Sequence, residues 1–259
     1  MTRGVTVARS RGGNLAGSGS GKPTGTPEAN DIRTRSVDLA STSLRELNAA
    51  LHAKPIAADV WRVLNPRGRH AVAAGVDAPV SIEIDGHVGY YCAGMNQHAS
   101  VTINGNAGVG VAENMMSGMV RVRGDASQAA GAAACGGLLV IEGNASARCG
   151  ISMKGIDIVV RGSIGHMSAF MAQAGNLLVL GDAGEALGDS IYEARLFVRG
   201  AVHSLGADCV EKEMRKEHVL AVQRLLQRSA ITDVSVRDIR RYGSARKLYH
   251  FHVDNVDAY

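Results

Sequence analysis

Between residues 82 and 200 the chain repeats one short pattern, in which two apolar residues flank a variable residue and a glycine follows two positions later. The first copy is Ile82-Glu-Ile84-Asp-Gly86. The closing glycines of the copies are Gly86, Gly105, Gly124, Gly143, Gly162, Gly181 and Gly200, each nineteen residues from the next. The alternation with period two predicts a strand in each copy, and a fixed period of about twenty residues is typical of a solenoid.

The connections between these strands are rich in Gly and Ala and show no amphipathic helical pattern. This argues against βαβ units, whose crossovers usually carry a helix. We therefore predict an all-β core, a single-stranded, right-handed parallel β-helix of about seven 19-residue turns over residues 81–206. Helical caps are expected at its N- and C-terminal ends.

Aligning the copies on the glycine supports stacked turns. The residues two positions before the glycine are all β-branched: Ile84, Ile103, Val122, Ile141, Val160, Val179 and Val198. The residues seven positions after it are all small: Ala93, Ala112, Gly131, Gly150, Ala169, Gly188 and Ala207. We expect the first column to stack in the core and the second to form a tight corner. The glycine column itself indicates a turn that needs either a positive φ or a close backbone approach.

Three further segments flank the predicted coil. Residues 1–35 are basic, without periodicity, and are predicted to be a disordered extension. Residues 36–80 are predicted to hold a capping helix, opened by the capping box Ser43-Leu-Arg-Glu46, and an entry segment. Residues 207–259 are predicted to form a helical cap and tail, with a helix from Asp208 to about Arg228 as a lid over the last turn. Residues 232–241 are compatible with another short helix, and residues 248–254 with a strand, an arm or a frayed end.

Charge and cysteine usage narrow the functional classes. The net charge of +4 arises in residues 1–35, which hold six of the 28 Lys and Arg and two of the 24 acidic residues, so the rest balances at 22 and 22. Such a basic tail is usually solvated, and nucleic-acid binding is not expected.

No apolar run reaches the roughly 18 residues of a membrane span, and no signal peptide is visible, so we expect a cytoplasmic protein without membrane contact. The cysteines form no C-x-x-C pair; Cys92 and Cys149 share one column three turns apart and are expected to be buried.

Candidate chemistry is sparse. Gly105-Asn-Ala-Gly108-Val-Gly110 follows a strand like a phosphate-binding loop, but no helix follows to hold the phosphate. His250 and His252 lie close together without an evident third metal ligand. The acidic residues of the coil are spread over several turns, unlike the paired carboxylates of glycosidases. We therefore expect no catalytic, cofactor-binding or metal-binding residues in this chain.

Two segments, 113–117 and 165–173, put large apolar residues where neighbouring turns carry small ones. These residues are Met115, Met116, Met167, Phe170 and Met171. They either fill the core of the coil or form an exposed patch of the kind found at protein interfaces. The sequence leaves both interpretations open.

Residues 80–205 resemble the C-terminal β-helix domain of the large subunit of glutamate synthase. Several phrases are similar to the stand-alone form of this domain, one subunit of N-methylglutamate synthase (methylamine–glutamate N-methyltransferase). These phrases are Gly89-Tyr-Tyr-Cys-Ala-Gly-Met-Asn96, Ala112-Glu-Asn-Met-Met-Ser-Gly118, Cys149-Gly-Ile-Ser-Met-Lys-Gly155, Gly165-His-Met-Ser-Ala-Phe-Met-Ala-Gln-Ala-Gly175 and Leu205-Gly-Ala-Asp-Cys-Val-Glu-Lys212.

The resemblance implies a structural subunit of a higher-order hetero-oligomer that makes N-methylglutamate from glutamate and methylamine. Its implied partners are a class II glutamine amidotransferase-like subunit and an FMN-binding synthase subunit, and the latter would carry the FMN and an iron–sulfur cluster. Two alternatives stay open: the coil subunit of a formyltransferase/hydrolase or formylmethanofuran dehydrogenase complex, and a free-standing β-helix enzyme or binder. The methionine-rich phrases favour the first interpretation over the other coil subunits. A free-standing enzyme or binder would need clustered carboxylates with basic or aromatic neighbours on one exposed face, and the sequence does not show them.

Overall fold

The computed structural model describes residues 32–246 and leaves residues 1–31 and 247–259 undescribed. Its first elements are β1 (Thr34–Asp38), α1 (Leu44–His52), β2 (Val60–Leu64), β3 (Ser81–Asp85), β4 (Ser100–Ile103), β5 (Met119–Val122) and β6 (Leu138–Ile141). They are followed by β7 (Lys154–Val160), β8 (Ala174–Val179), β9 (Arg195–Val198), β10 (Cys209–Lys212), α2 (Lys216–Arg228), the 3₁₀ turn η1 (Val236–Asp238) and β11 (Arg240–Ser244). The strands form one sheet in the order β1-β2-β3-β4-β5-β6-β7-β8-β9-β11-β10.

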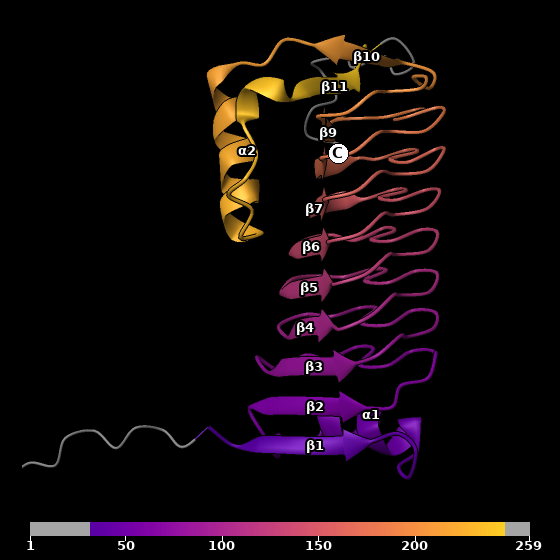
Figure 1. The fold of residues 1–259 in the computed structure, drawn as a ribbon, viewed down its shortest axis with the longest axis vertical. Helices are drawn as coiled ribbons and strands as arrows, with labels where there is room; N and C mark the ends of the chain where they lie inside the picture. The colour runs from indigo at the N-terminus through magenta and orange to yellow at the C-terminus, as the bar shows by residue number, and fades with distance from the viewer. Residues whose placement is uncertain (1–31, 247–259) are drawn as a thin grey trace, which may run out of the picture. The chain divides into compact units, whose positions relative to one another are not determined.

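The strands β3 to β9 confirm the predicted parallel β-helix (Figure 1). Each strand pairs in parallel with the next, with a shift of nineteen residues, as in Ile84↔Ile103. A second ladder of single bridges follows two residues after each glycine, from Val88↔Ala107 to Ala183↔Val202. The β-branched column of the strands is fully buried, because successive turns stack identical positions. The second ladder is buried from Val88 to Ala183, and Val202 at its end is only partly buried.

The parallel ladder begins two strands earlier than the sequence predicts. The strand β1 pairs with β2, and β2 pairs with β3, both in parallel. Trp61 of β2 stacks on Ile82, is completely buried, and donates its indole N–H to the Ala58 carbonyl at 3.0 Å. Two predicted boundaries are therefore wrong: Thr34 and Arg35 belong to β1, and the coil starts before residue 81.

The predicted capping helix is present as α1, and its capping box is complete. The Ser43 hydroxyl accepts the Glu46 N–H at 3.2 Å, and the Glu46 carboxylate accepts the Ser43 N–H at 2.8 Å. Leu47 and Leu51 are buried in the core of the coil. The Asn48 side chain donates to the Ala71 carbonyl at 2.9 Å, so α1 is fixed to the turn that follows β2.

The C-terminal cap differs from the prediction. The helix α2 begins at Lys216 rather than at Asp208, since residues 209–212 form β10. Where the sequence is compatible with another short helix, over residues 232–241, the structure has only the turn η1 and then the start of β11 at Arg240. The strand β11 pairs antiparallel with β9 and with β10. The strand β11 thus supplies hydrogen-bond partners for the edge of β9. Without it, this edge would present unpaired N–H and C=O groups to other chains.

The helix α2 lies beside the coil and packs on the outer face of the last strands (Figure 1). Val222, Leu225 and Leu226 of α2 form a second apolar core with outward-facing residues of β6 to β9. Those residues include Val140, Val159, Leu178 and Phe197. The prediction of α2 as a lid over the last turn is wrong. Within residues 32–246, the helices are too short and too polar to cross a membrane.

Candidate functional site

The turn glycines are required by close backbone approach between consecutive turns. The Gly143 N–H donates to the Gly124 carbonyl at 3.0 Å, and the bond recurs from Gly124 to Gly200. A Cβ on Gly143 would lie 2.8 Å from the Gly124 oxygen, and one on Gly105 would lie 2.6 Å from the Gly86 carbonyl carbon. Of the seven, only Gly86 has a positive φ, so close approach and not φ selects glycine in the other six.

A ladder of polar side chains runs beside the glycines, and the sequence analysis missed it. From Gly105 to Gly181, the side chain of the residue after the glycine accepts the backbone N–H of its counterpart in the next turn. The bonds are Asp125 N–H to Asn106 Oδ1 at 3.0 Å, Asn144 to Asp125 Oδ1 at 2.7 Å, Ser163 to Asn144 Oδ1 at 2.8 Å, Asp182 to Ser163 Oγ at 2.9 Å and Ala201 to Asp182 Oδ1 at 2.7 Å. The sequence does contain a signal for this ladder, because hydrogen-bond acceptors directly follow five consecutive turn glycines: Asn106, Asp125, Asn144, Ser163 and Asp182.

The column of small residues forms the predicted tight corner. Ala93, Ala112 and Ala169 are fully buried, with φ values of 52°, 57° and 58°. The residues two positions before and after each of them are also left-handed, as at Tyr91 (59°) and Met95 (56°) around Ala93. Because alternate residues turn outward here, large side chains at the flanking positions remain exposed.

The five residues of the predicted partner interface lie at or next to this corner and differ in their exposure to solvent. Met115 is fully buried, so it fills the core and lies outside any exposed patch. Met116 and Met171 are 51% and 38% exposed, and Met167 and Phe170 are half-buried. These four residues remain a predicted interface.

Three exposed residues that the sequence analysis did not assign to the interface extend the same corner. Tyr90 and Tyr91 are each 49% exposed and Met95 is 55% exposed. Two turns separate Met116 from Met167. The corner of the first carries only small side chains over residues 129–134, and the corner of the second carries the exposed Arg148 and the partly buried Ile151. We define the corner surface as Tyr90, Tyr91, Met95, Met116, Met167, Phe170 and Met171. Aromatic and methionine side chains are enriched at protein interfaces, and charged ones are depleted in their centres.

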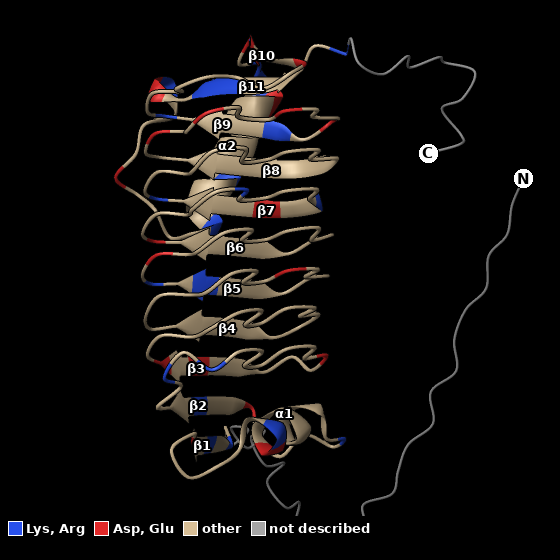
Figure 2. Ribbon diagram, turned by 90° about the vertical axis from the view of Figure 1, so that its right-hand side faces the viewer, with Lys and Arg blue, Asp and Glu red and all other residues tan. Residues whose placement is uncertain are grey.

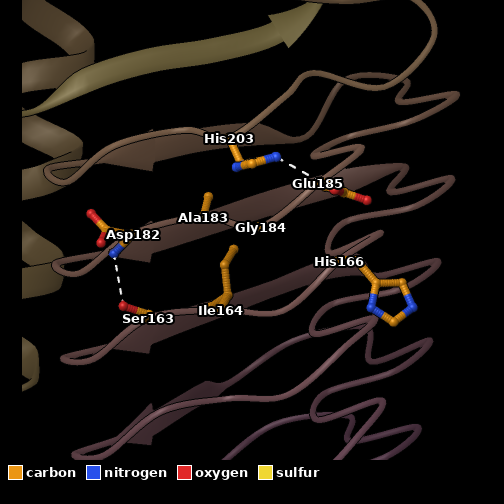
Figure 3. A pocket seen from close by; sticks show the side chains of 8 residues that line it. All are labelled: Ser163, Ile164, His166, Asp182, Ala183, Gly184, Glu185 and His203. Carbon is orange, nitrogen blue, oxygen red and sulfur yellow. Dashed lines mark hydrogen bonds and ion pairs between the residues drawn. The ribbon is translucent and has the colours of Figure 1, made fainter.

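A hollow of about 540 Å³ lies on the outside of the second ladder (Figure 3). It is lined by Ser163, Ile164, His166, Asp182, Ala183, Gly184, Glu185 and His203. His203 Nε2 lies 3.4 Å from a Glu185 carboxylate oxygen, and both side chains are well exposed. Figure 3 shows Ser163 beside Asp182, away from this pair, and its hydroxyl accepts the Asp182 N–H. The hollow thus brings together no serine, histidine and carboxylate in a nucleophilic arrangement.

The Gly105–Gly110 stretch uses its amides in the coil, as the absence of a following helix indicated. The Gly108 N–H donates to the Val88 carbonyl at 3.0 Å, and the Gly110 N–H donates to the Gln128 carbonyl at 3.0 Å. A phosphate would have to compete with these backbone bonds.

Of the four cysteines, Cys92, Cys149 and Cys209 are buried and Cys135 is exposed. Burial raises the pKa of Cys92 and of Cys149 to about 12, which keeps both thiols protonated. Among residues 32–246, no three His, Cys, Asp or Glu side chains gather at metal-binding distance. His250 and His252 lie outside the described residues.

Comparison with known proteins gives one strong relationship. The chain is 63% identical over 225 residues to protein GlxC of Rhizobium meliloti (strain 1021), a match that covers 86% of this chain and 99% of that protein. No family model matches the chain. No solved structure matches it either.

Proposed function

Because the chain belongs to the family of protein GlxC, we propose that it acts as a non-catalytic structural subunit of a glutamate-synthase-like enzyme complex. The complex makes N-methylglutamate from glutamate and methylamine, in the cytoplasm. The observation that carries this proposal is the corner surface, where Tyr91, Met95 and Met116 project from a coil whose turn amides are hydrogen-bonded to neighbouring turns.

The partners are a class II glutamine amidotransferase-like subunit and an FMN-binding glutamate-synthase-like subunit, which also holds an iron–sulfur cluster. The in-register strands β3 to β9 suit a scaffold, because each turn is hydrogen-bonded to its neighbours and positions on different turns keep fixed distances. Seven apolar side chains on one corner offer the aromatic and methionine anchors that dominate binding energy in interfaces.

The corner surface is tested by a double substitution, Met116→Ser with Met171→Ser. We expect the variant to fold normally, because both methionines are exposed in the free chain. We expect it to lose partner subunits on purification, since each methionine that becomes buried in the interface contributes roughly 1–2 kcal/mol to binding. The matched control is Leu220→Ser, because Leu220 is 52% exposed on α2, remote in the fold from the corner. Partner retention by the double variant equal to that of the control would refute the assignment of the corner surface.

A further inference from the structure

A second hollow, of about 640 Å³, lies between the ends of the strands β5 to β7 and the loop that follows α2. We call it the basic pocket. It is lined by Arg121, Arg123, Glu142, Arg161, Ser229, Ala230 and Ile231. Figure 2 shows basic positions, in blue, where the strands from β5 to β7 pass α2.

The repeat of the coil builds this pocket. Arg123, Glu142 and Arg161 each precede the turn glycine, in three consecutive turns, so their backbones stack about 4.8 Å apart. Arg121 lies two residues before Arg123 and therefore faces the same side of the sheet. The C-terminal end of α2 closes the pocket, and the Ser229 carbonyl accepts a hydrogen bond from Arg121 Nη2 at 3.0 Å.

The positive charges in the pocket exceed the negative ones. Arg121 and Arg123 both donate to the same Glu142 oxygen, Oε1, at 2.8 Å each. Arg161 pairs with Asp233 at 2.9 Å. Three guanidinium groups thus face two carboxylates, which leaves one positive charge uncompensated in this cluster.

The exposed arginines keep N–H groups available. The Arg121 side chain is only 15% exposed and is fixed between Glu142 and Ser229. The Arg123 and Arg161 side chains are 55% and 39% exposed, and each uses one N–H in these pairs. A guanidinium has five N–H donors, so both can bind a further oxyanion.

We propose that the basic pocket binds a small organic carboxylate. Guanidinium groups bind carboxylates through two parallel hydrogen bonds, and one carboxylate would neutralise the surplus charge. Ala230 is exposed at the pocket and offers an apolar contact for the carbon skeleton of the ligand, while Ile231 is almost fully buried. The volume lies within the range of small-molecule sites. This site does not depend on which enzyme complex the chain joins.

Calorimetric titration of the full chain with succinate at low ionic strength tests the proposal. We expect saturable binding that Arg123→Gln and Arg161→Gln each weaken roughly tenfold, the effect of losing one charge-assisted interaction. Arg199→Gln is the matched control, since Arg199 holds the same position before Gly200, is exposed, and lies outside the pocket. Its affinity should equal that of the parent chain.

A gain of affinity distinguishes binding in the pocket from general damage. Glu142→Gln removes the carboxylate that competes for Arg121 and Arg123, and we expect it to tighten succinate binding roughly tenfold. Absence of saturable succinate binding would overturn the proposal, as would equal losses in the Arg123, Arg161 and Arg199 variants. Stronger binding of inorganic phosphate than of succinate would overturn the choice of a carboxylate.

Discussion

Replacing Gly143 by alanine tests the reason for the glycine column. The added Cβ would meet Asp125 Oδ1 and would lie 2.8 Å from the Gly124 carbonyl oxygen. The turn must therefore separate from its neighbour. Two hydrogen bonds lie at this point, Gly143 N–H to Gly124 O at 3.0 Å and Asn144 N–H to Asp125 Oδ1 at 2.7 Å.

The expected magnitude follows from these two bonds. Leaving a polar group without its partner costs about 1–3 kcal/mol, and both groups are partly solvated, so we expect a total loss of about 2–4 kcal/mol. For a domain of this size, 1 kcal/mol shifts the melting temperature by about 2–4 °C, which gives a decrease of roughly 4–16 °C.

The assay is thermal and urea unfolding followed by circular dichroism. The control is Gly243→Ala, because a Cβ at Gly243 would lie at ordinary contact distances, 3.7 Å from the Ala194 oxygen and 3.8 Å from Lys212 Cδ. We expect the control to change the free energy of unfolding by less than about 1 kcal/mol. Equal stability of the Gly143 and Gly243 variants would refute the argument from close approach.

Two further predictions concern the packing of α2. Burial, followed by the charge of Arg241, lowers the pKa of His218 below its ordinary 6.5; Arg195 and Arg215 act in the same direction and Glu217 opposes them. The folded state then binds fewer protons than the unfolded state, so the stabilising contribution is present above pH 6.5 and is lost as the pH falls through the lowered pKa. Urea unfolding should show this dependence, and His218→Gln should remove it; an unchanged pH profile would contradict the assignment. Phe197→Ala should cost about 3–5 kcal/mol and speed amide exchange in α2, since Phe197 is fully buried in the second core. Exchange in α2 equal to that of the parent chain would show that the helix does not depend on this contact.

The coil itself could be predicted because its repeat is uninterrupted from Gly86 to Gly200. The first two strands were missed because their spacing differs: β1 and β2 start 26 residues apart, and β2 and β3 start 21 apart. Trp61 and Val63 show the same alternation as Ile82 and Ile84, but Asn65, at a φ of 54°, stands where the later copies carry glycine.

The sequence also indicates which strands have a covered outer face, through the residues three positions before each glycine. Three residues before each glycine, the chain reads Glu83, Thr102, Arg121, Val140, Val159, Leu178 and Phe197. The change from polar to apolar after Arg121 marks the strands whose outer face is covered. Which segment covers that face depends on tertiary packing, and no local pattern specifies it.

The inward or outward direction of residues in the corner could not be read from alternation. Left-handed residues at Tyr91, Ala93 and Met95 break the simple period of a strand. Met115 and Met116 therefore could not be assigned by period, and only the structure separates the buried one from the exposed one. The basic pocket was missed for a different reason, because Ser229 and Arg121 are 108 residues apart in the chain.

The central claim, that this coil joins two other subunits, is tested most directly by purifying the tagged full chain from its own host. The quantities to measure are the native mass and the flavin absorbance of the purified material. The account predicts a species containing two further kinds of chain together with a flavin spectrum. A lone, colourless chain that stays in solution would contradict it.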